Sequence, residues 1–285
     1  MSKIAGVVIL YHPEPGETIK NIESYLGYLD CLYVIDNSGQ PSAEIRQLAQ
    51  TPKVIYIDNG RNEGIAASLN KAAVLASQNQ ADWLLTMDQD SFFEPAEAQN
   101  YFSSFEKEFA DKKDIAVVAP AHFKEGVKDR AGLYTELVSV LTSGCLVQLA
   151  IWQAVKGFDE RLFIDEVDHE YCYRVKKAGY RVLQFNSIFL NHQLGRKTNA
   201  GYLGLVAKRS RTIHSPQRIY FMVRNYLYVK SIYKSLFPEE FRERNKAVLV
   251  AIKNNLFFSG KFLANLKSIL NAYQDYRAGN FSKTI

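Results

Sequence analysis

The first 120 residues alternate short apolar runs with stretches in which apolar residues recur every three or four positions. The apolar runs, rich in Val and Ile, predict β-strands at 4–10, 31–35, 54–57, 83–87 and 115–119. The helical spacing predicts helices near 19–29, 41–48 and 64–76, and Pro95 marks a further helix start. Strands that alternate with helices are typical of βαβ units, so we expect an α/β fold whose mostly parallel central sheet is flanked by helices.

The pattern is less regular in the middle of the chain and becomes helical again near its end. It predicts a strand at 145–149, helices at 151–155 and 166–178, the second stopping at Gly179, and short strands at 181–183 and 188–190. From Pro216 onward the pattern is helical and aromatic, with Pro238 as a helix start and amphipathic stretches at 247–258 and 262–273. We therefore expect a first domain at 1–212 and a C-terminal helical extension at 213–285.

Composition places the chain among folded proteins of a reducing compartment. Hydrophobic residues make up 47% and charged residues 23%, which excludes disordered and collagen-like chains. The three cysteines, Cys31, Cys145 and Cys172, form no C-x-x-C pair, so we expect neither a disulfide framework nor a zinc ribbon. The run at 4–10 lacks the features of a signal peptide, and polar residues interrupt the uncharged run at 137–155. We therefore expect a cytoplasmic protein.

Charge is divided unevenly along the chain. Residues 201–285 hold 15 Lys and Arg against 4 Asp and Glu, a net charge of +11, whereas the first 200 residues carry a net −6. The basic third predicts an anionic partner such as phosphate, nucleic acid or a membrane surface. It lacks a recognisable nucleic-acid motif, so we do not expect nucleic acid. Lysines beside Phe and Leu in the last two helices fit a peripheral membrane contact, and equally fit packing or a homo-oligomer interface.

Polar residues follow four of the predicted strands at the point where each strand ends. These groups are Tyr11-His12-Pro13, Asp36-Asn37-Ser38, residues 58–64 and Asp88-Gln89-Asp90. Ligands of open α/β sheets bind beyond the carboxyl ends of the strands, so these groups predict a site. The chain has no dinucleotide-binding G-x-G-x-x-G and no P-loop motif. Asp88 and Asp90 could hold Mg²⁺ or Mn²⁺, which would offset the charge of a diphosphate leaving group; an ordinary polar turn is the alternative.

A second acidic group begins the helix predicted at 166–178. Its members are Asp165, Glu166, Asp168 and Glu170. On one helix they would pair at three- and four-residue spacing and raise one another's pKa, which suits a base that takes a proton from a hydroxyl. The alternative is an acidic first turn favoured by the helix dipole. His192 follows an apolar run, and the upstream aspartates favour a metal ligand over a structural histidine.

Several of these groups together resemble the motifs of glycosyltransferase family 2, which are inverting enzymes of the GT-A fold. More narrowly, the chain is similar to bacterial rhamnosyltransferases that use a dTDP-linked sugar. The segments that carry the resemblance are 34–38, 62–66 with Asn70, 87–91, 143–146, 157–160, 163–170 with Arg174, 191–195, and Arg218-Ile219-Tyr220 with Arg224-Asn225. The resemblance covers nearly the whole chain, and it is specific for the family and less specific for the sugar.

The resemblance implies a role for each group. Tyr11 and Asp36 would hold the nucleoside, Asn62 would help to position it, and Asp88 and Gln89 would lie against the nucleotide sugar. Asp88, Asp90 and His192 would bind the divalent metal, Mn²⁺ or Mg²⁺. Asp168 would be the catalytic base, supported by Glu170 and Asp165. Arg218 and Arg224 are six residues apart, which is about 600° of helical turn, so they would lie on different faces of one helix, and one would reach the diphosphate while the other packs.

One departure from the family's motif leaves the identity of the catalytic base undecided. The family often has Glu-Asp in the acidic motif, whereas Val167 precedes Asp168 here. Asp165 and Glu166 therefore remain alternative candidates for the catalytic base. The spacing back from Arg174 favours Asp168.

The expected function is transfer of a sugar to a hydroxyl. The sugar would be L-rhamnose from dTDP-β-L-rhamnose, and the acceptor a lipid-linked or polysaccharide molecule of cell-wall, capsule or O-antigen synthesis. Residues 1–120 would form the nucleotide-sugar-binding half of the catalytic domain and residues 121–212 its acceptor-binding half. The protein would work in the cytoplasm or peripherally at the inner face of the cell membrane. The alternatives are a UDP-sugar donor and a nucleotide-sugar-binding protein without activity.

Overall fold

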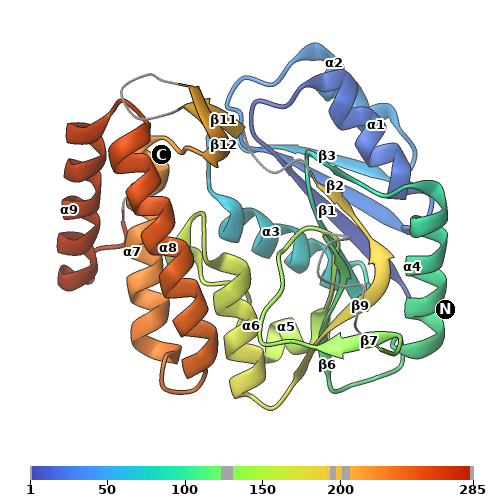
Figure 1. Cartoon of the computed structure of the whole chain (residues 1–285). Helices are drawn as coiled ribbons and strands as arrows, with labels where there is room; N and C mark the ends of the chain where they lie inside the picture. Colours follow the sequence, from blue (N-terminus) through green and yellow to red (C-terminus); the bar gives the residue numbers. More distant parts are fainter. Residues whose placement is uncertain (1, 123–130, 193–196, 201–205, 283–285) are drawn as a thin grey trace. The chain divides into compact units, whose positions relative to one another are not determined.

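The computed structural model describes residues 2–122, 131–192, 197–200 and 206–282, and Figure 1 labels the main elements. The strands are β1 (Ile4–Leu10), β2 (Cys31–Asp36), β3 (Val54–Asp58), β4 (Trp83–Asp88), β5 (Ser91–Phe92), β6 (Ile115–Ala121), β7 (Tyr134–Glu136), β8 (Cys145–Gln148), β9 (Arg181–Phe189), β10 (Asn191–His192), β11 (Lys197–Ala200) and β12 (Val206–Thr212). The α-helices are α1 (Pro15–Leu26), α2 (Ala43–Gln47), α3 (Ile65–Gln78), α4 (Pro95–Glu108), α5 (Leu149–Ala154), α6 (Val167–Lys177), α7 (Pro216–Tyr233), α8 (Pro238–Phe258) and α9 (Phe262–Ala278).

An eight-stranded sheet forms the centre of the first part of the chain, in the order β3-β2-β1-β4-β8-β6-β9-β7. The pairs among β3, β2, β1 and β4 and the pair β6–β9 are parallel, whereas β8 and β7 run antiparallel to their neighbours. The register sets Leu10 beside Asp36, Asp36 beside Asp58, and Ile9 beside Asp88. The carboxyl ends of β1, β2, β3 and β4 therefore lie level at one edge of the sheet.

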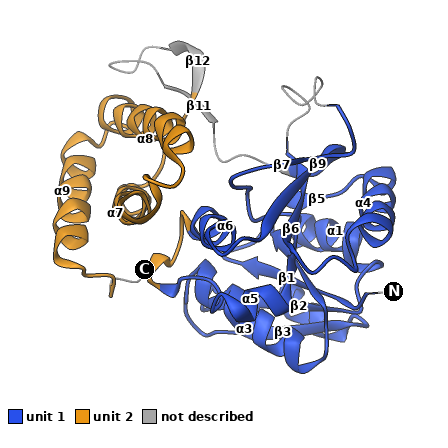
Figure 2. Cartoon of the chain, turned by 90° about the horizontal axis from the view of Figure 1, so that it is seen from below, with its two compact units in different colours: residues 1–160, 167–193, 284–285 blue, residues 161–166, 194–283 orange. Residues whose placement is uncertain are grey.

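Helices cover both faces of this sheet. The helices α1, α2 and α4 lie on one face, and α3, α5 and α6 lie on the other (Figure 1, Figure 2). The first face buries Tyr25 of α1 and Phe105 of α4 against strand residues such as Val8 and Leu85. Ile22, whose spacing with Ile19 and Leu26 predicted the first helix, is buried in the same cluster, because a helical period places apolar side chains on one face of the helix. The α/β fold with a central sheet flanked by helices is confirmed.

The chain divides into two compact units, coloured separately in Figure 2. Unit 1 consists of residues 1–160, 167–193 and 284–285, and unit 2 of residues 161–166 and 194–283. This division differs from the expected boundary between 212 and 213, because residues 161–166 and the β11–β12 hairpin group with the C-terminal helices. Phe163 belongs to the apolar cluster of unit 2, where its ring stacks 5.3 Å from that of Phe221.

Some elements differ from those that the sequence predicted. The two short strands expected at 181–183 and 188–190 form the single strand β9. The polar side chain of Asn186, which lies between them, has hydrogen-bond partners within the fold. Its Oδ1 accepts a bond from the Thr135 hydroxyl at 2.8 Å, and its Nδ2 donates to the Gly132 carbonyl at 3.1 Å. The short strand β7, which supplies Thr135, had no sequence signal of its own. None of the helices that the structure describes has the length and hydropathy needed to cross a membrane.

Candidate active site

The ends of β1 and β4 are joined by the side chain of Gln89. Its Oε1 accepts a bond from the Tyr11 backbone N–H at 2.8 Å, and its Nε2 donates to the Tyr11 carbonyl at 3.3 Å. The Asn21 side chain of α1 donates to the Gln89 carbonyl at 3.0 Å. The Tyr11 ring remains 45% exposed at this edge of the sheet. Gln89 therefore fixes the backbone of Tyr11 and leaves its aromatic ring accessible to a ligand.

Asp36 ends β2 and is fully buried. One carboxylate oxygen accepts a bond from the Ser38 N–H at 2.8 Å, and the other accepts from the Tyr56 hydroxyl at 3.0 Å. Burial and the neighbouring Asp36 charge raise the pKa of Tyr56 well above its usual value, so this phenol stays protonated and donates. Each carboxylate oxygen has two lone pairs, so each keeps an acceptor site beyond these bonds, and a ligand N–H reaches it only when the groups that cover Asp36 move.

Asn37 is the organising residue of this edge, and the sequence analysis gave it no role. Its buried Oδ1 accepts a bond from the Asn59 side chain at 2.8 Å, and its Nδ2 donates to the Ser68 hydroxyl of α3 at 3.1 Å. The Asn62 side chain accepts from the Gly64 N–H at 2.9 Å, which forms the turn that leads into α3. The signal for Asn37 was its place directly after Asp36 in the polar segment that ends the strand, and that place does not reveal its hydrogen-bond partners.

Asp88 and Asp90 lie at the carboxyl end of β4. The Asp88 backbone N–H donates to the buried Ser143 hydroxyl at 3.1 Å, and the Gly144 N–H donates to the Thr86 carbonyl at 2.7 Å. Residues 142–145, which we call the β8 loop, therefore hold the acidic strand end in place. The short strands β5 and β10 pair next to it, with His192 opposite Ser91.

The donor set at this position fits a divalent metal. Two carboxylates supply the oxygen ligands that Mg²⁺ and Mn²⁺ prefer. The backbone register brings His192 beside the residue that follows Asp90, while its side chain lies outside the described residues. Among the side chains that the structure does describe, no three of His, Cys, Asp and Glu converge as a metal site. The side chain of His192, the third ligand predicted from the sequence, is not among the side chains that the structure describes.

Asp168 is held by the same β8 loop. It is the second residue of α6, and its Oδ2 accepts a bond from the Thr142 N–H at 3.2 Å while its Oδ1 accepts from the His169 N–H at 2.8 Å. Thr142 in turn accepts a bond from the Thr86 hydroxyl of β4 at 2.6 Å. The structure therefore connects the predicted base to the strand that ends in Asp88, over a chain separation of 80 residues that the sequence alone does not bridge.

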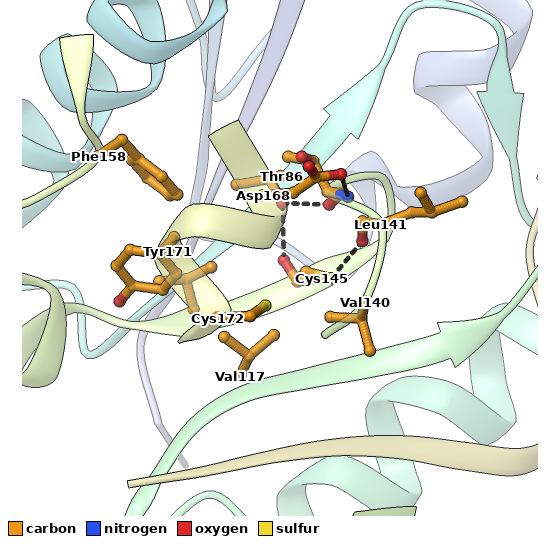
Figure 3. Close-up of a pocket in the computed structure, with 11 residues that line it drawn as sticks. Thr86, Val117, Val140, Leu141, Cys145, Phe158, Asp168, Tyr171 and Cys172 are labelled. Atoms are coloured by element: carbon orange, nitrogen blue, oxygen red, sulfur yellow. Dashed lines mark hydrogen bonds between the residues drawn. The ribbon is translucent and has the colours of Figure 1, made fainter. Parts of the chain in front are cut away.

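A small cavity of ≈ 20 Å³ lies against Asp168 (Figure 3). Its other walls are mostly apolar, and its volume suits about one water molecule. Cys145 and Cys172 line it, and burial raises the pKa of Cys172 to about 12 and that of Cys145 well above its usual value. These thiols stay protonated at neutral pH, so neither serves as a thiolate nucleophile. The cavity is a packing gap behind the carboxylate and is too small for a sugar.

The four acidic residues do not share one helix face, which corrects the expected i, i+3 and i, i+4 pairing. The helix α6 begins at Val167, and Asp165 and Glu166 precede it with backbone φ of 61° and 68°. Glu170 is buried and forms a bidentate ion pair with Arg174, at 3.0 Å from Nε and 2.7 Å from Nη2. Glu170 thus has a fixed cation of its own, and Asp168 is bound through backbone N–H groups.

Unit 2 holds the other acidic residues and both predicted arginines. Arg218 is half-exposed and pairs with Asp165 at 3.2 Å, and Glu166 pairs with Arg244. Arg224 is fully buried, and its Nη2 donates to the Arg161 carbonyl at 3.0 Å. Of the two predicted arginines, Arg224 is therefore the one that packs.

Asn225 holds the backbone of residues 161–166, a role that the sequence analysis missed. Its Nδ2 donates to the carbonyls of Leu162 at 2.6 Å, Ile164 at 2.7 Å and Asp165 at 3.2 Å. Phe163, like Asp165, has a positive φ. Backbone in this region is held only where its surroundings fix it, and the buried amide of Asn225 provides that fixation.

Comparison with known proteins places this site in a family. A model of the glycosyl transferase family 2 sequence matches residues 7–172. The dTDP-rhamnosyl transferase RfbF of Shigella flexneri is 28% identical over 246 residues, covering 79% of this chain and 78% of that protein. A crystal structure of GalNAc-T7 with UDP, GalNAc and Mn²⁺ has a TM-score of 0.56 at 11% identity, covering 81% of this chain. The match takes in 48% of that longer chain, about half its length, and it shows the fold alone.

The family model spans β1 to the first half of α6, and so includes the sheet edge, the acidic end of β4 and Asp168. The described geometry and the family match therefore fall on the same residues. The chain belongs to glycosyl transferase family 2.

Proposed function

We propose that the protein is an inverting glycosyltransferase that moves L-rhamnose from dTDP-β-L-rhamnose to a hydroxyl of a lipid-linked or polysaccharide acceptor. The observation that carries the chemistry is the β8 loop, which bonds both the end of β4 at Asp88 and the predicted base Asp168. The observation that supports the sugar is the 28% identity to a dTDP-rhamnosyl transferase over 79% of the chain. Such a product would belong to cell-wall, capsule or O-antigen synthesis. The sugar transfer would take place in the cytoplasm or at the inner face of the cell membrane.

The donor would bind along the level edge of β1, β2 and β4. Asp36 would accept a bond from a base N–H, and the exposed Tyr11 ring would lie against the nucleoside. Gln89 would act by fixing the Tyr11 backbone, and Asn62 by shaping the turn before α3. Arg218 is the exposed arginine of unit 2, and we assign it to the diphosphate in preference to the buried Arg224.

A divalent metal is part of the proposal. Asp88 and Asp90, with His192, would hold Mn²⁺ or Mg²⁺, and support comes from their oxygen donors and from a structural relative crystallised with Mn²⁺. When bound, the metal would neutralise charge that develops on the departing diphosphate.

The proton transfer is assigned to Asp168. Its carboxylate would take the proton of the acceptor hydroxyl as that oxygen forms a bond to the anomeric carbon of the sugar. The bond from the anomeric carbon to the diphosphate oxygen breaks on the opposite side, which inverts the configuration. The N–H groups of Thr142 and His169 orient the carboxylate. Glu170 is paired with Arg174, so its role would be to hold α6, and Asp165 would support the site by holding Arg218 in place.

A thermal-shift panel tests the donor and the metal together. The protein is melted with dTDP-L-rhamnose, dTDP-glucose, UDP-glucose, UDP-galactose or GDP-mannose, each with Mn²⁺, Mg²⁺ or EDTA. We expect dTDP-L-rhamnose to raise the melting temperature in the presence of metal only, since a ligand of the native state stabilises it in proportion to its affinity. A shift with a UDP-sugar instead would overturn the sugar. Donor binding without transfer to any acceptor would favour the nucleotide-sugar-binding protein without activity.

A further inference from the structure

The helices α8 and α9 expose large apolar side chains in unit 2. Leu263 is 78% exposed and Leu249 is 65% exposed, values typical of residues with no protein neighbour over most of their surface. The exposed apolar residues of these two helices are Leu249, Val250, Phe257, Phe262, Leu263, Leu270 and Tyr273, and we call them the α8–α9 surface. Several exposed large apolar side chains on two neighbouring helices are typical of an interaction site.

The two helices bring exposed aromatic rings together at the turn between them. The rings of Phe257 and Phe262 lie 6.1 Å apart, so the last turn of α8 meets the first turn of α9. On α8, Leu249 and Phe257 are two helical turns apart with Lys253 between them, and on α9 Leu263 and Leu270 flank Lys267 in the same way. Apolar side chains and lysines therefore share one exposed stripe on each helix.

The charge of this segment has one sign only. From Arg244 to Gln274 the chain contains no Asp or Glu. The lysines at 253, 261 and 267 are exposed. A lysine of this kind lays its methylene chain along apolar groups and directs its ammonium outward. A partner that fits must accept apolar side chains and carry negative charge beside them.

We propose that the α8–α9 surface docks on the surface of an anionic lipid bilayer. Phe257, Phe262 and Leu263 at the helix turn would enter the boundary between headgroups and acyl chains, and the lysines would lie against lipid phosphates. A second copy of the chain fits less well, because a symmetric interface centred on the helix turn would bring the lysines of both copies together. The acidic residues of α8 and α9, at 239, 240, 243 and 275, lie at the opposite ends of the two helices. The inference needs no nucleotide sugar and does not rest on the proposed function.

Vesicle sedimentation with the full chain tests the proposal. The probes are vesicles of phosphatidylcholine alone and vesicles of phosphatidylcholine mixed with phosphatidylglycerol. We expect sedimentation with the mixed vesicles only, weakened by salt. The variant Lys253→Gln/Lys261→Gln/Lys267→Gln should bind roughly a hundredfold more weakly, at about fivefold for each charge removed near the surface. The variant Phe257→Ser/Leu263→Ser should also lose binding, since it removes exposed apolar groups without any change in charge.

A matched control separates local contact from net charge. Lys20→Gln/Lys112→Gln/Lys113→Gln removes the same charge from exposed positions of unit 1 and should leave vesicle binding unchanged. The melting temperature of each variant, measured without lipid, checks that it is folded. The proposal is overturned if the protein does not sediment with mixed vesicles, or if the control weakens binding as much as the α8–α9 lysine variant does. Dimers in sedimentation velocity that Leu263→Ser dissolves, with no vesicle binding, would assign the surface to a second copy.

Discussion

Replacement of Asn225 by alanine should release residues 161–166 from α7. The two hydrogens of the Asn225 amide serve three carbonyls, so about two full hydrogen bonds to the segment are lost, each with a net value of about 1 kcal/mol. The bond that its Oδ1 accepts from Arg224 Nε lies within α7 and is not counted here. Carbonyls that remain buried without a donor add roughly 1 kcal/mol or more. The positive φ of Phe163, Asp165 and Glu166 favours relaxation of the segment once it is released. We therefore expect about 3 kcal/mol of local destabilisation, which corresponds to roughly a hundredfold larger population of the open segment.

Trypsin cleavage after Arg161 measures this opening in the native protein. The Arg161 carbonyl accepts a bond from Arg224 in the closed segment, so cleavage requires the segment to open. When closing is faster than cleavage, the cleavage rate follows the open population. Asn245→Ala is the matched control, because the Asn245 side chain bonds Tyr226 and Lys230 of α7 instead. An increase below tenfold for Asn225→Ala, or an equal increase for Asn245→Ala, would refute the role of Asn225 in holding residues 161–166.

Three further predictions concern single residues. Asp168→Asn should lower the rate of transfer at least roughly a hundredfold and preserve donor binding, because only the proton acceptor is lost; loss of donor affinity in the folded variant would contradict the role. Arg174→Met should lower the free energy of unfolding in urea by about 3 kcal/mol, because Glu170 stays buried without its cation, and adding Glu170→Gln should recover part of the loss. Burial and the Arg218 charge lower the pKa of His214 below 6.5, so its protonation favours the unfolded chain and thermal stability should fall as the pH drops through and below 6.5. That fall should be smaller in His214→Gln, and equal slopes in the two proteins would contradict it.

The sequence predicted the elements because their signals are local. The strand at 4–10 was predicted with its observed bounds, and Pro95, Pro216 and Pro238 each begin an observed helix. A proline at the first helical position has no N–H to lose and a backbone angle that suits a helix, so the signal does not depend on the rest of the fold. The sheet edge was predictable for the same reason, since parallel strands that end in polar residues bring those residues level. Strand β7 escaped prediction because its pairing with β9 is purely tertiary.

What the sequence by itself determined is the family and the α/β class, and it predicted the residues of the candidate site, because residue identity and period are properties of the chain alone. The tertiary structure decided which partner each charged group has. Four carboxylates within six residues look equivalent in sequence, yet Glu170 pairs with Arg174 one turn away, while Glu166 pairs with Arg244 at a separation of 78 residues. The hydrogen bonds by which Asn225 holds residues 161–166 depend in the same way on contacts between distant segments, and so does the burial of Arg224. Such contacts form only when the chain folds, because hydrogen bonds and burial depend on position in space and not on order along the chain.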